Sequence, residues 1–216
     1  MSNSNGSLAP VTGFVLAGGK SSRMGQDKAF LLLRDRSLLA HALERVDAVT
    51  GRVRIVGSPE KFAAFGTVVE DRYTEQGPLA GIHAALEQTS TDLNLIVAVD
   101  LPFLKSSLLN YLLSQSRDTM AAVIVPRTAR GLQPLCAVYR RSFAEVAERS
   151  LRAGKNKIDP LFAEVKTKII EQDELARNGF SEETFRNVNT AQDWEAAKRE
   201  FSENSADSER LISRHP

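Results

Sequence analysis

The segment 93–99, L-N-L-I-V-A-V, is an almost unbroken apolar run that ends abruptly at Asp100. A run of this length is typical of a β-strand buried on both faces, as in a parallel sheet that helices cover on either side. Such a strand constrains the whole chain, because helices must lie between the strands and cover both faces of the sheet.

Strands and helices alternate along the chain in the way that this constraint demands. We predict strands over 11–17, 52–56, 67–70, 93–99, 121–125, 134–139 and 165–170, and helices over 37–49, 59–65, 77–89, 106–115, 142–152 and 190–201. This order predicts one α/β domain over 11–202, a three-layer α/β/α sandwich with a mostly parallel, Rossmann-like sheet. The polar ends, residues 1–10 and 203–216, are expected to be disordered.

Composition argues against several classes of function. The formal net charge is only +1 and 6% of the residues are aromatic, so nucleic acid is not an expected partner. The single cysteine, Cys136, lies in an apolar run and is expected to be buried rather than nucleophilic. The apolar runs are too short to span a bilayer and the N-terminus lacks the pattern of a signal peptide, so we expect no membrane association and a cytoplasmic location.

The loop after the first strand, L-A-G-G-K-S-S-R-M-G-Q-D-K-A over 16–29, has the composition of a phosphate cradle. Gly18 and Gly19 allow close approach of the backbone to a ligand, and Arg23 and Lys28 add positive charge. The loop matches neither the P-loop nor the dinucleotide-binding spacing. From the residues alone, a phosphate cradle and a flexible turn with solvated charges both remain open.

The same loop resembles the signature L-A-G-G-x-S-x-R-M-G-x-D-K of molybdenum cofactor guanylyltransferases, without a gap. Further matches follow in order: E-D at 70–71, G-P-L-A-G at 77–81, D-L-P-F at 100–103, Q-P-L at 133–135 and N-V-N-T at 187–190. The resemblance covers about residues 12–200. Gly19 and the G-P-L-A-G segment resemble the guanine-specific branch rather than the cytidine-specific one.

This resemblance implies a Mg²⁺-dependent enzyme that moves GMP from GTP onto the terminal phosphate of molybdopterin and releases pyrophosphate. A phosphate nucleophile is already ionised, so no general base is needed. The implied catalytic residues are Arg23, Lys28 and Asp100, with Asp100 as the metal ligand. Arg23 and Lys28 would bind the triphosphate, and the backbone of Gly18 and Gly19 would donate hydrogen bonds to it.

The implied GTP-binding residues are Leu16, Ala17, Gly18, Gly19, Lys28, Asp71, Gly77, Pro78, Leu79 and Asp100. Asn187 and Asn189 match positions that the family places near the pterin. Each motif also has a purely structural explanation: Asp71 and Asp100 as turn or helix caps, residues 77–81 as a helix start, and the asparagines as a β-turn. Gly57 stands where family members often carry an asparagine that touches the nucleotide, so that contact is not carried over.

The resemblance also implies transient contact with cofactor-delivery proteins or acceptor molybdoenzymes. Three other functions stay open: a cytidylyltransferase for the same pterin, an adenosylcobinamide phosphate guanylyltransferase, and a nucleotide-binding module without catalysis. The presence of Arg23, Lys28 and Asp100 argues against the last of these.

Overall fold

A computed structural model describes residues 9–18 and 27–212 of the chain. Its main sheet has the strand order β10-β7-β9-β6-β1-β4-β5. These strands are β1 (Val11–Leu16), β4 (Val53–Val56), β5 (Val68–Val69), β6 (Leu93–Ala98), β7 (Val123–Thr128), β9 (Cys136–Arg140) and β10 (Thr167–Ile170). Apart from β9, which is antiparallel to β6 and β7, neighbours in this order are parallel. The predicted mostly parallel sheet is confirmed, and the strand predicted over 165–170 forms one edge.

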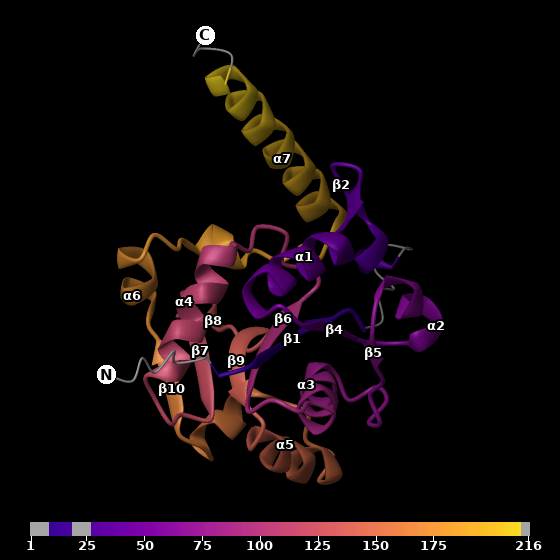
Figure 1. The fold of residues 1–216 in the computed structure, drawn as a ribbon, viewed down its shortest axis with the longest axis vertical. Helices are drawn as coiled ribbons and strands as arrows, with labels where there is room; N and C mark the ends of the chain where they lie inside the picture. Colours follow the sequence, from indigo (N-terminus) through magenta and orange to yellow (C-terminus); the bar gives the residue numbers. More distant parts are fainter. Residues whose placement is uncertain (1–8, 19–26, 213–216) are drawn as a thin grey trace, which may run out of the picture.

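Helices cover both faces of the sheet, as the apolar run at 93–99 requires (Figure 1). Helices α3 (Pro78–Glu87) and α5 (Phe143–Arg152) pack together on one face, and α1 (Leu38–Thr50) and α4 (Ser106–Arg117) pack on the other. The remaining helices are α2 (Pro59–Phe62), α6 (Gln172–Arg177) and α7 (Ala191–Ile212). The three-layer α/β/α architecture is therefore confirmed.

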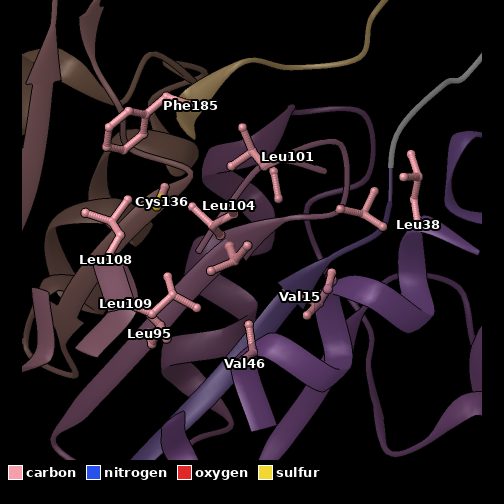
Figure 2. Close-up of a cluster of buried hydrophobic side chains, with 14 of the residues drawn as sticks. Val15, Leu38, Val46, Leu95, Leu101, Leu104, Leu108, Leu109, Cys136 and Phe185 are labelled. Atoms are coloured by element: carbon pink, nitrogen blue, oxygen red, sulfur yellow. The ribbon is translucent and has the colours of Figure 1, made fainter. Parts of the chain in front are cut away.

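Alternation of side chains along the central strands divides the core into two clusters. In β1, Phe14 and Leu16 pack with α3 and α5, whereas Val11 and Val15 pack with α1 and α4. Figure 2 shows part of the second cluster, in which Val15 and Leu95 of the sheet lie near Val46 of α1 and Leu109 of α4. Both faces of the strand are thus apolar because each faces a helical layer.

Local chemistry fixes where α1 begins and ends. The Ser37 hydroxyl accepts a hydrogen bond from the Ala40 amide at 3.1 Å, which caps the N-terminus. Gly51 ends the helix with a φ of 63°, a left-handed conformation that glycine adopts without strain. Gly13 lets the helix approach the sheet, because a Cβ atom there would lie 2.1 Å from Val46 Cγ1.

Several elements differ from the sequence prediction. The short hairpin of β2 (Leu32–Leu33) and β3 (Arg36–Ser37) was not predicted, because its turn residues Arg34 and Asp35 have positive φ angles without being glycine. Helix α6 and strand β8 (Gly131–Leu132), which pairs with β7, are too short to leave a periodic pattern.

The final helix also differs from its prediction. Helix α7 continues to Ile212 rather than ending at Phe201, so the tail predicted to be disordered is helical as far as Ile212. Residues 191–212 contain no glycine or proline and many alanine, glutamate, lysine and arginine residues, which favour helix. Residues 1–8 and 213–216, which complete the ends predicted to be disordered, lie outside the described residues. Within the described part of the chain, no helix has the length and apolar character needed to cross a membrane.

Candidate functional site

A cavity of about 700 Å³ opens at the carboxyl ends of β1, β4 and β6. The chain leaves β1 between two strands that come later in the sequence, β4 on one side and β6 on the other. Ligands bind at such points in open α/β sheets. A smaller cavity of about 480 Å³, between α5 and residues 155–164, contains none of the predicted site residues.

Most of the predicted nucleotide-binding residues line the larger cavity, in agreement with their position after strands. Those lining it are Leu16, Ala17, Gly18, Lys28, Asp71, Gly77, Pro78 and Asp100. Gly19 and Arg23 fall outside the described residues. The Leu79 side chain is wholly buried in the α3–α5 core rather than facing the cavity, so only its backbone, in the first turn of α3, lies near the site.

Asp100 follows β6, and its carboxylate is a largely buried acceptor at the cavity wall. Its side chain is 20% exposed, and its Oδ1 atom is buried with no hydrogen-bond partner among the described residues. Burial raises the pKa of the Asp100 carboxyl above its ordinary value, and the nearby Lys28 ammonium opposes this rise. A desolvated carboxylate with an unpartnered oxygen is suited to accept a cation.

Lys28 lies opposite Asp100 and links two distant parts of the chain. Its Nζ atom is 4.0 Å from Asp100 Oδ2 and donates a hydrogen bond of 2.7 Å to Asn189 Oδ1. Asp27, immediately before it, caps the short 3-10 helix Lys28–Phe30 by accepting from the Ala29 amide at 3.2 Å. The Lys28 ammonium therefore lies between Asp100, the carboxylate predicted to bind the metal, and Asn189, the asparagine predicted to lie near the acceptor.

The segment 187–190 reaches this site from the start of α7. The Val188 amide donates to the Asp100 carbonyl at 2.9 Å, which fixes the segment against the end of β6. Neither asparagine lines the cavity itself, but Asn189 bonds directly to Lys28, as described above, whereas Asn187 is half-buried and makes no hydrogen bond to a predicted site residue in the described part of the chain. The structure therefore brings one of the two predicted asparagines to the site.

Asp71 and α3 form another wall of the cavity. Asp71 Oδ1 accepts from the Tyr73 amide at 2.6 Å, so the residue caps a turn and also faces the cavity. Burial raises the pKa of the Asp71 carboxyl, and the Tyr73 amide opposes this rise. Gly77 precedes α3 with a φ of 70°, a backbone conformation that favours glycine. The N-terminus of α3, where backbone N–H groups attract anions, thus opens onto the cavity.

Gly18 and Gly57, at the cavity, are each constrained by the surrounding structure. The Gly18 amide donates to the Val56 carbonyl at 3.1 Å, so it is already engaged in the sheet and does not point a free N–H at a phosphate. A hydrogen bond from Gly18 to a phosphate, as predicted, would require this amide to leave the Val56 carbonyl. Packing explains why position 57 is a glycine, because a Cβ atom there would lie 2.8 Å from the buried ring of Phe62.

Sequence reasoning left out several residues that line the cavity. Asp27 belongs to the G-x-D-K motif and Leu135 to Q-P-L, so both could have been found from the motifs. Gly81 lies within the G-P-L-A-G motif, and Gly57 stands at a position where family members often contact the nucleotide, so both also had a signal in the motifs. Glu75 lines the cavity as well, and nothing in the local pattern singled it out. Lys61 Nζ donates to Asp27 Oδ2 at 2.9 Å and so anchors α2 beside the site. Among the described residues, no group of three or more His, Cys, Asp or Glu residues is placed to hold a metal.

Comparison with known proteins places the chain in a family. The model of the MobA-like NTP transferase domain matches residues 13–168, a range that contains every described residue lining the cavity. This chain belongs to the MobA-like NTP transferases. Within them it falls in the molybdenum cofactor guanylyltransferase family, as two curated relatives show. A probable molybdenum cofactor guanylyltransferase of Pelotomaculum thermopropionicum is 38% identical over 200 residues, covering 92% of this chain and 96% of the relative. Another, from Carboxydothermus hydrogenoformans, is 36% identical over 193 residues, covering 89% and 97%.

Solved structures agree with this assignment. This MobA-like transferase matches the molybdopterin-guanine dinucleotide biosynthesis protein A of Archaeoglobus fulgidus with a TM-score of 0.78 and 26% identity, over 89% of this chain and 99% of the other. A CMP:2-keto-3-deoxy-manno-octonic acid synthetase, at 13% identity and a TM-score of 0.70, shares the fold. The chain is therefore a nucleotidyltransferase, and the sequence prediction of an enzyme of this class is confirmed.

Proposed function

We propose that this nucleotidyltransferase moves GMP from GTP to the terminal phosphate of molybdopterin. An oxygen of the acceptor phosphate attacks the α-phosphorus of GTP, a new phosphoanhydride bond forms, and the bond to the β-phosphate breaks. Pyrophosphate leaves with the electron pair, and the product is molybdopterin guanine dinucleotide. No proton has to be removed from the acceptor, because its phosphate is ionised at neutral pH.

The observation that carries this proposal is the arrangement of charge in the cavity. Lys28, Asp100 and the N-terminus of α3 surround one space at the ends of β1, β4 and β6. Such a space suits a triphosphate, which needs cations and N–H groups around it, and little else for catalysis. The names of the curated relatives, probable molybdenum cofactor guanylyltransferases, support a guanylyl donor and a molybdenum cofactor acceptor.

Asp100 is the residue that would hold Mg²⁺. The ion commonly binds one or two carboxylates and completes its octahedron with phosphate oxygens and water, so one aspartate with an open oxygen is sufficient. The buried, unpartnered Oδ1 of Asp100 fits this requirement. When bound, the ion would neutralise charge on the phosphates of the nucleotide.

Lys28 is the residue that would stabilise the leaving pyrophosphate. Its ammonium lies beside the Asp100 carboxylate, where the triphosphate of a bound nucleotide would pass. Charge grows on the leaving group as the bond breaks, so a fixed cation there contributes more to the transition state than to binding. Arg23, predicted to share this task, belongs to the loop outside the described residues.

The test is incubation of the protein with molybdopterin, Mg²⁺ and α-labelled GTP or CTP, followed by identification of the labelled product. We expect labelled molybdopterin guanine dinucleotide and an equal amount of pyrophosphate, with Asp100→Asn as the inactive control. Preferred use of CTP would establish a cytidylyltransferase of the same fold. Transfer only to adenosylcobinamide phosphate would reassign the acceptor, and nucleotide binding without transfer would indicate a non-catalytic module. Contact with acceptor molybdoenzymes and a cytoplasmic location stay predictions from the sequence.

A further inference from the structure

Asp193, in the first turn of α7, binds the backbone of the segment that delivers Asn189 to the site. One of its oxygens, Oδ2, accepts from the Asn189 amide at 3.0 Å and from the Thr190 amide at 2.8 Å. Its own amide donates to the Thr190 hydroxyl at 3.1 Å. The side chain and backbone of Asp193 therefore close a reciprocal cap at the start of the helix.

This cap extends further than helix stability requires. The Thr190 hydroxyl already serves the helix as its N-cap acceptor. The bond from the Asn189 amide to Asp193 lies outside the helix and fixes the backbone of the preceding loop. A charged acceptor of two amide hydrogen bonds holds such a loop more firmly than a neutral one.

The same loop has a second anchor on its other side. The amide of Val188, which is 1% exposed, donates to the carbonyl of Asp100 at 2.9 Å. The loop around Asn189 is thus anchored on one side by the Asp100 carbonyl and on the other by the Asp193 carboxylate. Because its backbone is fixed on both sides, Asn189 holds its side-chain oxygen where it accepts a hydrogen bond of 2.7 Å from Lys28 Nζ.

We propose that Asp193 is a positioning residue for the acceptor side of this site, acting through Asn189. This inference rests on the proposed function, in which Lys28 binds the phosphates of the nucleotide, and on the sequence prediction that Asn189 lies near the pterin. The Lys28–Asn189 hydrogen bond joins the two substrate sites, and Asp193 sets the position of its asparagine end. Loss of the Asp193 carboxylate leaves Asn189 poorly placed for the acceptor while the walls formed by β1, β6 and α3 still receive GTP.

The kinetic test compares four variants of the full chain. Asp193→Ala removes the acceptor of both amides. Asp193→Asn keeps a carbonyl oxygen that can accept the same bonds. Thr190→Ala removes the cap hydroxyl but keeps both bonds to Asp193. Glu195→Ala removes an equal charge from the same helix, where that side chain pairs with Lys198 and makes no hydrogen bond to the described residues of the loop.

We expect Asp193→Ala to raise KM for molybdopterin by about tenfold, the scale of losing a charge-assisted hydrogen bond, with KM for GTP changed less than about twofold. Asp193→Asn should recover most of the loss, and the other two variants should stay within about twofold of the wild type. A merely structural role would lower the active fraction, and so kcat, without separating the two KM values. The proposal is overturned if Thr190→Ala matches Asp193→Ala, if Asp193→Asn is as impaired as Asp193→Ala, or if both KM values stay at the wild-type level.

A measurement without substrates separates this proposal from the proposed function. Hydrogen exchange of the Asn189 and Thr190 amides, followed by NMR, should be much faster in Asp193→Ala than in the wild type and in Glu195→Ala. Fluorescence of Trp194, the single tryptophan and 9% exposed, checks that the start of α7 stays folded. If the wild type transfers no GMP, the proposed function fails, but the exchange result still decides whether Asp193 holds the loop. Unchanged exchange in Asp193→Ala overturns the positioning role.

Discussion

Replacing Asp100 with asparagine should make the ligand-free protein more stable while abolishing its activity. The Asp100 carboxylate is buried, and one of its oxygens has no hydrogen-bond partner among the described residues. An unsatisfied buried acceptor costs about 1–3 kcal/mol, and a charged group costs more than a neutral amide. The attraction of Lys28, at 4.0 Å, offsets part of this cost. We therefore expect a net gain of about 1 kcal/mol for Asp100→Asn, or about 2–4 °C in Tm for a chain of this length.

The pH dependence of this gain has a defined sign. The folded pKa of Asp100 is raised above the unfolded value of 3.8, so the folded state binds more protons between the two values. The contribution of this group to stability therefore falls as pH rises through that window, and stays low above it. The Tm difference between Asp100→Asn and the wild type should accordingly be larger at neutral pH than near the unfolded pKa of 3.8.

The measurement is thermal unfolding without Mg²⁺ or nucleotide, together with the GMP transfer assay. Asp100→Ala serves as a second variant, since it should also fold and lack Mg²⁺-dependent turnover. If Asp100→Asn lowers Tm by several degrees, the carboxylate supports the fold and the reasoning from its unpartnered oxygen fails. Turnover at the wild-type level would mean that the metal binds elsewhere.

Four further predictions follow from the site and the core. Lys28→Ala should lower kcat by about a hundredfold with a smaller loss of GTP affinity. Lys20→Ala, at a variable position of the same motif, should change kcat only mildly. Steady-state kinetics showing the reverse order would refute the assignment. GTP should bind at least about tenfold more tightly than CTP or ATP in calorimetric titration, equal to about 1.4 kcal/mol, and a preference for CTP would contradict the guanylyl assignment. Gly57→Asn should lower the free energy of unfolding by about 1–3 kcal/mol in denaturant titration, because its Cβ would meet the ring of Phe62; an unchanged midpoint would show that the ring yields easily. Burial raises the pKa of the Cys136 thiol to about 12, so a thiol reagent should label Cys136 only after unfolding, and rapid labelling of the native protein would disprove its burial.

The layers of the fold could be predicted because burial leaves a pattern in the sequence. The strand at 93–99 is apolar on both faces because α1 and α4 cover one face and α3 and α5 the other. The direction of β9 left no such pattern, because a buried strand has the same composition whether it runs parallel or antiparallel. Its reversal follows from the pairing of β7 with β8 around Gly131, whose φ is 105°.

The site could be predicted where residues directly follow a strand. Asp100 and Asp71 lie at the cavity for this reason. The spacing of Leu79, Ile82 and Leu86 is that of one face of a helix, which explains why the Leu79 side chain is buried although the family motif implies a contact with GTP. The contact between Lys28 and Asn189 could not be predicted from the sequence, since the two residues are 161 positions apart and no local pattern encodes their pairing.

That separation has a consequence for how the protein matures on the ribosome. The strands and helices that build the cavity walls are all complete before residues 187–190 are synthesised, and domains begin to fold as their segments emerge. A nascent chain can therefore assemble the cavity walls first, before the segment that carries Asn189 is available to Lys28. A product truncated before residue 187 would keep every strand of the described sheet yet lack Asn189, the residue predicted to lie near the acceptor. Under the proposed function, competence to use both substrates is thus acquired only after residues 187–190 have been synthesised.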